Sequence, residues 1–199
     1  MPEAEVLVVR DPQVAKLLAD DTRRKILLLL RVAEMTPQQI ARLLKKNVSS
    51  ITHHLSMLEG KGLVKVARVE VRRNLVVKWY KATAKRIIVS YELAEGLVPG
   101  SEEIAKHVED AAMKAAETLV EVGVKLSGEK VEEAAALIKR IYLMIREVYE
   151  KLVTKCLRCD DPWSRALLLN ALMAVELAGK REFAETVSEL RKLLGEQHG

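Results

Sequence analysis

Apolar positions between Asp11 and Leu58 recur every three or four residues, the spacing of helices with one buried face. One apolar stretch runs from Val14 to Leu30 and forms one helix or two. Thr36 and Pro37 then begin a short helix, because Thr caps helix N-termini and Pro suits the first turn. We expect its buried positions to be Ile40, Leu43 and Leu44. Asn47 caps a third helix with the apolar stripe Ile51, Leu55 and Leu58.

The period changes to two after Gly62. Residues 63–71 are rich in β-branched side chains and nearly alternate, and a second such run follows at residues 75–80. Arg72, Arg73 and Asn74 separate the two runs. This pattern predicts a β-hairpin with a basic tip. Three helices followed by such a hairpin is the arrangement of a winged helix-turn-helix.

Beyond Thr83 the pattern is entirely helical. A break at residues 98–101 precedes one stripe, and Ser127 and Gly128 separate it from a second. The first stripe comprises Ile104, Val108, Ala111, Ala115, Leu119, Val122 and Leu126; the second, here called the heptad seam, comprises Val131, Ala134, Ile138, Ile141, Ile145, Val148 and Leu152. A seam with alternating steps of three and four is typical of coiled-coil packing. It fits the core of an internal helical hairpin, a dimer interface, or both at once.

Two further helices are predicted, one from Asp161-Pro162 to Gly179 and one around residues 183–194. The expected fold class is therefore mainly α with a small β-hairpin wing: a winged helix-turn-helix joined to an all-helical C-terminal dimerisation region. We place the domains at residues 1–84, for DNA binding, and residues 85–199, for dimerisation and effector binding.

Composition narrows the class of protein. The chain has 199 residues, of which 49% are hydrophobic and 31% charged, enough apolar material for a packed core. The longest apolar runs have only five residues, as at Ile26–Leu30, far short of the roughly 18 needed to span a bilayer. The N-terminus lacks the basic and then apolar order of a signal peptide. We expect no membrane partner and a cytoplasmic location.

Charge is divided unevenly along the chain. Residues 1–85 contain 17 Lys and Arg against 8 Asp and Glu, a net charge of +9, whereas residues 86–199 contain 16 against 20, a net charge of −4. A basic first half favours a nucleic-acid-binding unit. Lysine-rich segments are also common on solvated protein faces, so charge alone leaves both interpretations open.

The third helix carries the candidate base-reading residues. In a helix-turn-helix this helix enters the major groove, and its exposed polar residues reach the base edges. The residues that lie off the apolar stripe are Ser49, Ser50, Thr52, His53 and Ser56, and no carboxylate occurs between Asn47 and Leu58. Candidate contacts to the DNA backbone, from the helix flanks and the wing, are Lys45, Lys46, Lys61, Lys65, Arg68, Arg72, Arg73, Asn74 and Lys78.

Residues 11–83 resemble the winged helix-turn-helix of the arsenical-repressor (ArsR) family of prokaryotic regulators. The resemblance lies in residues 21–30, in residues 39–44, and above all in Val48–Leu58 followed by Gly62-Leu-Val-Lys65. It implies a homodimeric DNA-binding repressor that recognises inverted repeats in double-stranded DNA. The longer helical second half resembles the dimerisation extension of archaeal winged-helix regulators.

The chain departs from the family at its metal sensor. Many members carry a Cys-x-Cys pair at the start of the recognition helix, whereas residues 46–53 contain no cysteine. Adjacent histidines such as His53 and His54 point about 100° apart on a helix, so they do not readily share a metal. We therefore expect no cofactor and no metal at this helix. Cys156 and Cys159 form a lone CxxC, which leaves structural thiols, a redox pair and half of a metal site open.

Catalytic motifs are missing from the sequence: it has no Gly-rich phosphate loop, no G-x-S-x-G and no H-E-x-x-H. We therefore expect a regulator and not an enzyme. The predicted function is a sequence-specific transcription regulator, a repressor by family likeness, which acts as a homodimer with a small-molecule effector as a further candidate partner. The alternative is a winged-helix module for protein interaction or non-specific DNA binding.

Overall fold

The computed structural model describes residues 4–72, 75–126, 128–155 and 161–195. The chain forms two compact units, residues 1–88 and residues 89–199. The first unit ends four residues beyond the boundary predicted after Ala84, within the strand that begins at that residue. No helix in the described residues is both long enough and apolar enough to cross a membrane.

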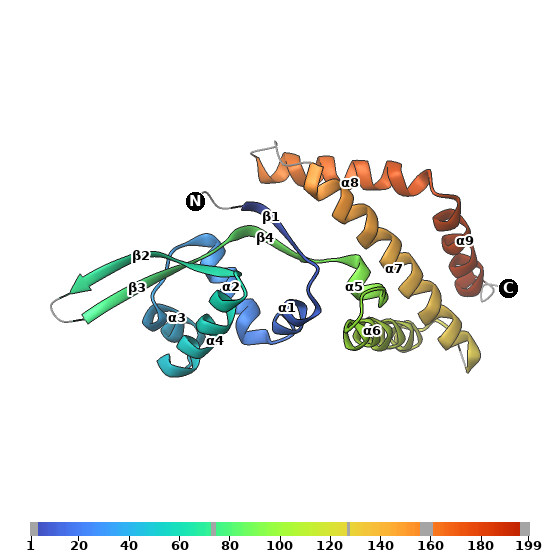
Figure 1. Ribbon diagram of the computed structural model, residues 1–199. Coiled ribbons are helices and arrows are strands. Elements are labelled where there is room, and N and C mark those ends of the chain that lie inside the picture. The colour runs from blue at the N-terminus through green and yellow to red at the C-terminus, as the bar shows by residue number, and fades with distance from the viewer. Residues whose placement is uncertain (1–3, 73–74, 127, 156–160, 196–199) are drawn as a thin grey trace. The chain divides into compact units, whose positions relative to one another are not determined.

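In its described residues, the N-terminal unit contains four helices and four strands. Figure 1 shows their arrangement. In chain order these are β1 (Ala4–Val9), α1 (Pro12–Leu17), α2 (Asp21–Val32), α3 (Pro37–Leu44), α4 (Val48–Gly60), β2 (Val64–Arg72), β3 (Leu75–Ala82) and β4 (Ala84–Val89). The apolar stretch at residues 14–30 thus forms two helices. Strands β2 and β3 pair antiparallel with a register shift between Val66 and Arg68. They form the predicted wing, so the mainly α fold with a hairpin wing is confirmed.

The core of this unit lies where α2, α3 and α4 meet the base of the wing. Its largest fully buried side chains come from each of these elements: Ile26, Leu30, Ile40, Ile51, Leu55, Leu58, Leu63 and Val64. The predicted stripe on α4 is confirmed, since all three of its members are fully buried. The predicted face of α3 is wrong at one position, because Leu43 is 56% exposed and Ala41 is buried in its place.

Strand β4 contradicts the expectation that the chain is helical beyond Thr83. Strand β4 pairs with β1 in a two-stranded sheet, and the backbone N–H of Ala4 donates to the carbonyl of Thr83 at 3.0 Å. Glu5 and Lys85 form an ion pair across the same sheet. A strand of six residues is too short for its periodicity to distinguish it from a helix. Its pairing partner lies some eighty positions away, so the neighbouring sequence does not reveal the pairing.

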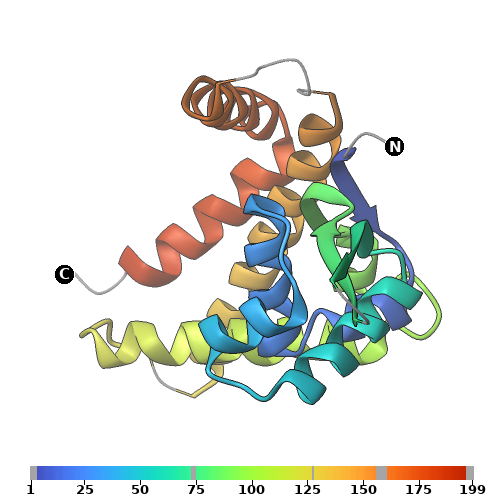
Figure 2. The same ribbon diagram turned by 90° about the vertical axis from the view of Figure 1, so that its left-hand side faces the viewer.

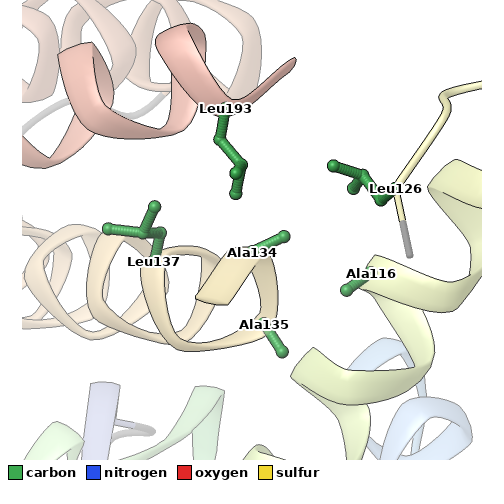
Figure 3. Close-up of a cluster of buried hydrophobic side chains, with 6 residues drawn as sticks. All are labelled: Ala116, Leu126, Ala134, Ala135, Leu137 and Leu193. Carbon is green, nitrogen blue, oxygen red and sulfur yellow. The ribbon is translucent and has the colours of Figure 1, made fainter. Parts of the chain in front are cut away.

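The C-terminal unit is helical throughout its described part, from α5 (Tyr91–Glu95) through α6 (Glu102–Glu121), α7 (Glu129–Lys155) and α8 (Pro162–Ala178) to α9 (Arg181–Gly195). The long helix α7 is the centre of the unit, and α6, α8 and α9 lie against it (Figures 1 and 2). One core cluster joins α6, α7 and α9 through Ala116, Ala134, Ala135, Leu137 and Leu193, with Leu126 from the loop (Figure 3).

The heptad seam packs within this unit. Ala134 belongs to the cluster of Figure 3, and Val131 and Ile138 pack against it. Val148 belongs to a second cluster with Leu177 of α8, against which Ile145 and Leu152 also pack. The stripe predicted for α6 is wrong at its two alanines: Ala112 and Ala116 are buried, and Ala111 and Ala115 are exposed. Leu126 of the same stripe belongs to the core cluster and Leu119 packs against it, as predicted. Val122 is 73% exposed because α6 ends at Glu121.

A buried carboxylate ties the start of the helical unit to α7. Glu150 is 5% exposed. Its carboxylate accepts the backbone N–H of Tyr91 at 3.0 Å and the hydroxyl of Ser90 at 3.3 Å. The N-terminus of α5 lacks a cap from its own Ser90 side chain, so Glu150 supplies that acceptor from another helix.

Helix α3 offers a direct test of its buried face. Ile40→Ala removes a fully buried side chain, so we expect the free energy of unfolding to fall by about 2–5 kcal/mol. Leu43→Ala on the same helix is the matched control and is expected to change it by no more than about 0.5 kcal/mol. Urea unfolding followed by circular dichroism measures both. Equal losses for the two variants would contradict the assignment of the buried face.

Candidate nucleic-acid interface

Helix α4 presents an uncharged polar face to solvent. Ser49, Thr52, His53 and Ser56 are all exposed and lie opposite the buried stripe of Ile51, Leu55 and Leu58. Ser50 lies on the flank and is half-buried. Four of the five candidate base-reading residues therefore share one face. Short hydroxyl side chains let a helix backbone come close to the base edges while still donating and accepting hydrogen bonds.

The N-terminus of α4 is fixed by the Asn47 side chain. Its Oδ1 accepts the backbone N–H of Ser50 at 2.7 Å and the hydroxyl of Ser49 at 3.0 Å. Thr52 donates its hydroxyl to the carbonyl of Val48 at 2.8 Å. These bonds define the rotamers at the end of the helix from which a recognition helix contacts bases. The Thr52 hydroxyl is left with its acceptor lone pairs for another group.

Two lysines lie in the turn that leads into α4. Lys45 adopts the left-handed conformation with φ 53° and ends α3, and both Lys45 and Lys46 are exposed. The capping box of α3 sets the start of this helix-turn-helix: the Gln39 side chain accepts the backbone N–H of Thr36 at 2.8 Å, and Gln39 donates its own backbone N–H to the Thr36 hydroxyl at 3.3 Å. The arrangement places two cations beside the positive end of α4, where an anion is favoured.

The remaining predicted backbone contacts have different surroundings. Lys78 is exposed on the wing and Lys65 is half-buried. Lys61 is exposed, and its ammonium donates to the Gln13 side chain at 3.2 Å. The predictions for Arg73 and Asn74 fall on residues outside the described part of the chain, and Arg72 is described only as part of β2. Their roles stay predictions.

Arg68 is held by the protein itself. Its guanidinium donates to Glu34 at 3.0 Å, forms an ion pair with Glu70, and lies 3.8 Å from the centre of the Trp79 ring. These contacts connect the wing to the segment between α2 and α3. The same segment is joined to β3 by two backbone hydrogen bonds between Met35 and Tyr80, at 3.0 and 2.9 Å. Arg68 therefore braces the base of the wing. Its predicted phosphate contact stays a prediction.

The two histidines of α4 have different environments. His53 is exposed, whereas His54 is half-buried and its Nδ1 is a buried atom without a hydrogen-bond partner among the described residues. Burial lowers the pKa of His54 below its ordinary 6.5, and the negative charge of Asp20 opposes the shift. Asp20 is the N-cap of α2, and its pKa is itself lowered, chiefly by the backbone N–H of Arg23, which it accepts at 2.8 Å. The structure thus gives the pair one outward ring and one packing ring.

The C-terminal unit contains an apolar cavity of about 360 Å³ between α6 and α7. Its walls include Val108, Ala111, Ala115 and Ile138 from the two predicted stripes, with His107, Lys139 and Tyr142 also among its lining residues. Sequence reasoning missed this hollow, because the stripes alone predict full burial. Cys156 and Cys159 lie outside the described residues, and the described part of the chain contains no cluster of three or more metal-ligating side chains.

The helix-turn-helix matches a known family. Residues 20–66 match the family described as bacterial regulatory protein, arsR family. The matched segment runs from the cap of α2 through α4 and into β2. It contains the whole candidate interface apart from Arg68, Lys78 and the wing tip. Together with the winged fold, this match supports a DNA-binding transcription regulator. No curated protein matches the chain.

Solved structures of winged-helix regulators also align with the chain. ZitR of Lactococcus lactis, a mutant in its apo form, is 25% identical over 65% of this chain and 84% of its own, with a TM-score of 0.28. PadR of Bacillus subtilis in complex with operator DNA is 19% identical over 86% of this chain and 98% of its own, with a TM-score of 0.29. At such TM-scores the superpositions carry no weight for the function of this protein.

The burial of His54 generates a prediction about pH. Its folded-state pKa lies below 6.5, so the unfolded chain takes up a proton at this side chain more readily than the folded one. The His54 contribution to stability is therefore complete above pH 6.5 and is lost as the pH falls towards the folded pKa. An NMR titration of the ring should give a midpoint below 6.5. Asp20→Asn should lower it further, because a charge that favours the imidazolium is removed. A midpoint above 6.5 would contradict the buried position.

Proposed function

We propose that this protein is a sequence-specific transcription regulator that acts as a homodimer on an inverted repeat in double-stranded DNA. The observation that carries the proposal is the exposed face of α4. It bears short hydroxyl side chains and one histidine, it lacks any carboxylate from Asn47 to Leu58, and it begins beside Lys45 and Lys46. It lies within the segment that matches the arsR family.

In the proposed complex, α4 enters the major groove. Ser49, Ser50, Thr52, His53 and Ser56 face the base edges, where hydroxyl and imidazole groups both donate and accept hydrogen bonds. Lys45, Lys46, Lys61, Lys65 and Lys78 contact phosphates, which orient the unit without reading sequence. The wing lies along the flanking backbone. Two such units in a dimer read half-sites about one helical turn apart.

Regulation follows from where the dimer binds. A homodimer on a promoter excludes the transcription machinery, so we propose repression as its effect. Residues 85–199 supply the dimer contacts. The cavity between α6 and α7 is the proposed site for a small-molecule effector, because it is apolar and has polar side chains among its lining residues. The protein acts in the cytoplasm and needs no cofactor for DNA binding.

Selection of genomic DNA fragments on the purified protein, followed by sequencing, tests this function. An enriched inverted repeat with half-sites about one turn apart is the expected result. Folded protein that enriches no sequence, and whose affinity falls equally steeply with salt on every DNA, would favour the alternative of a non-specific or protein-interaction module.

The base-reading residues give a prediction on specificity. Against the selected operator, His53→Ala and Ser50→Ala should each reduce the preference for the operator over scrambled DNA by about 1–3 kcal/mol, because a lost base contact weakens only the specific complex. Fluorescence anisotropy with both DNAs measures the ratio. Glu59→Gln, at the far end of α4, is the matched control that should keep the preference. An unchanged ratio in both alanine variants would remove these residues from base readout.

The lysines of the turn give a different prediction. Replacing Lys45 and Lys46 by Ala should weaken binding to all sequences and make the dependence of log affinity on log salt concentration shallower, by about 0.9 for each lysine that contacts a phosphate. The control replaces Lys106 and Lys114, two exposed lysines of α6, and so changes net charge equally. If both pairs flatten the salt dependence alike, the effect is one of overall charge and not of contact.

A further inference from the structure

Helix α8 leaves one apolar side without a partner among the described residues. Its inner side packs on α7 and α9, where Leu169 and Leu177 are buried. On its outer side Trp163 is 81% exposed, and Leu167 and Val175 are each 70% exposed. These three side chains are therefore largely open to solvent in the described part of the chain.

The exposed side chains form a continuous face. Besides the three already named, the exposed residues on it are Ser164, Leu168, Ala171, Ala174 and Ala178. These positions recur at steps of three and four, the spacing that buries one side of a helix against another helix. None of them is charged. Single exposed apolar side chains are ordinary, whereas a contiguous apolar stripe along a 17-residue helix marks an interaction surface.

The face is complementary to itself in size. When two copies of α8 pair antiparallel about a two-fold axis at Ala171, each residue lies opposite the one equally far from Ala171 on the other side. Leu167 then meets the partner's Val175, and Leu168 meets the partner's Ala174. Ala171 meets the partner's Ala171, where small side chains let the two helices approach closely. Small side chains thus lie at the centre of the contact and Leu168 packs against Ala174, while the larger Leu167 and Val175 pack together further out.

Charge on the flank favours the same orientation. Arg165 and Glu176 lie on one flank of the stripe, six residues before and five residues after Ala171. The antiparallel arrangement brings each Arg165 near the partner's Glu176, so two opposite-charge pairs form. A parallel arrangement would bring like charges to the same level. Such exposed pairs contribute little affinity, but they select one orientation.

We propose that α8 is the contact through which two copies of this chain pair, antiparallel and centred on Ala171. This pairing supplies the dimer contact of the proposed function. It rests on that function only in its connection with DNA binding. A second copy fits this face better than nucleic acid does, because the stripe carries no cation to neutralise phosphate. Six of the seven heptad-seam residues of α7 pack within the unit, so we assign the contact between copies to α8.

Charge placed in the stripe should break the dimer. Sedimentation equilibrium of the full-length chain is expected to show a dimer, and Leu167→Glu or Val175→Glu should raise its dissociation constant at least tenfold. Leu97→Glu changes another exposed apolar residue of the same unit and should leave the dimer intact. Circular dichroism confirms that each variant is folded. A wild-type chain that is monomeric, or stripe variants that dimerise normally, would overturn the proposal.

Cysteine cross-linking tests the orientation. In a chain whose Cys156 and Cys159 are replaced by Ser, Ala171→Cys should form an intermolecular disulfide under mild oxidation, because the two sites meet at the axis. Ser164→Cys should not, since antiparallel pairing separates the two copies of that position by about 20 Å, from a rise of about 1.5 Å per residue. Cross-linking at position 164 would overturn the antiparallel arrangement.

Charge exchange and DNA binding complete the test. Arg165→Glu should weaken the dimer and the double variant Arg165→Glu/Glu176→Arg should restore it; a double variant weaker than the single one would contradict the pairing.

Measurements of DNA binding separate the proposal of an α8 contact from the proposed function. An intact α8 dimer that selects no operator would contradict the function alone, whereas operator selection by a dimer insensitive to Leu167→Glu would contradict the α8 contact alone.

Discussion

Burial of one stripe on α4 sets the orientation on which the rest of the N-terminal unit depends. Ile51, Leu55 and Leu58 are fully buried, and their burial fixes which side of the helix meets solvent. The hydrophobic contribution of three such side chains, about 1.5–3 kcal/mol each, outweighs any preference of the polar residues opposite. The opposite face, which carries Ser49, Thr52, His53 and Ser56, is therefore exposed to solvent because the apolar face is buried in the core.

Around that helix, capping and bracing contacts hold the candidate interface in shape. Asn47 fixes the start of α4, the Thr36–Gln39 capping box fixes the start of α3, and Arg68 ties the wing to Glu34 over the Trp79 ring. The basic residues of this unit therefore differ in their surroundings. Arg68 contacts Glu34, Glu70 and the Trp79 ring, whereas Lys45, Lys46 and Lys78 lie exposed.

The C-terminal unit uses its apolar surface in two ways. The heptad-seam residues of α7 in the two core clusters pack against neighbours within the unit, from α6, α8 and α9. Helix α8 is apolar on nearly all sides, so packing against α7 and α9 covers only part of its surface. A helix of that kind is stable in water when a second partner covers the rest. This constraint is the physical basis for assigning the contact between copies to α8.

The sequence alone determined the parts that rest on local chemistry: the capped helices, the stripe of α4, the hairpin wing and four of the five residues on the exposed face. Tertiary packing decided the rest. Whether Leu43 or Ala41 is buried on α3, and whether Ala111 or Ala112 is buried on α6, depends on where the neighbouring elements lie, which a helical period does not specify. The pairing of β1 with β4 joins residues about eighty positions apart, and Arg68 finds Glu34 only once the chain is folded. Long-range contacts of this kind leave no periodic trace in the sequence, because their partners are set by the fold and not by neighbours along the chain.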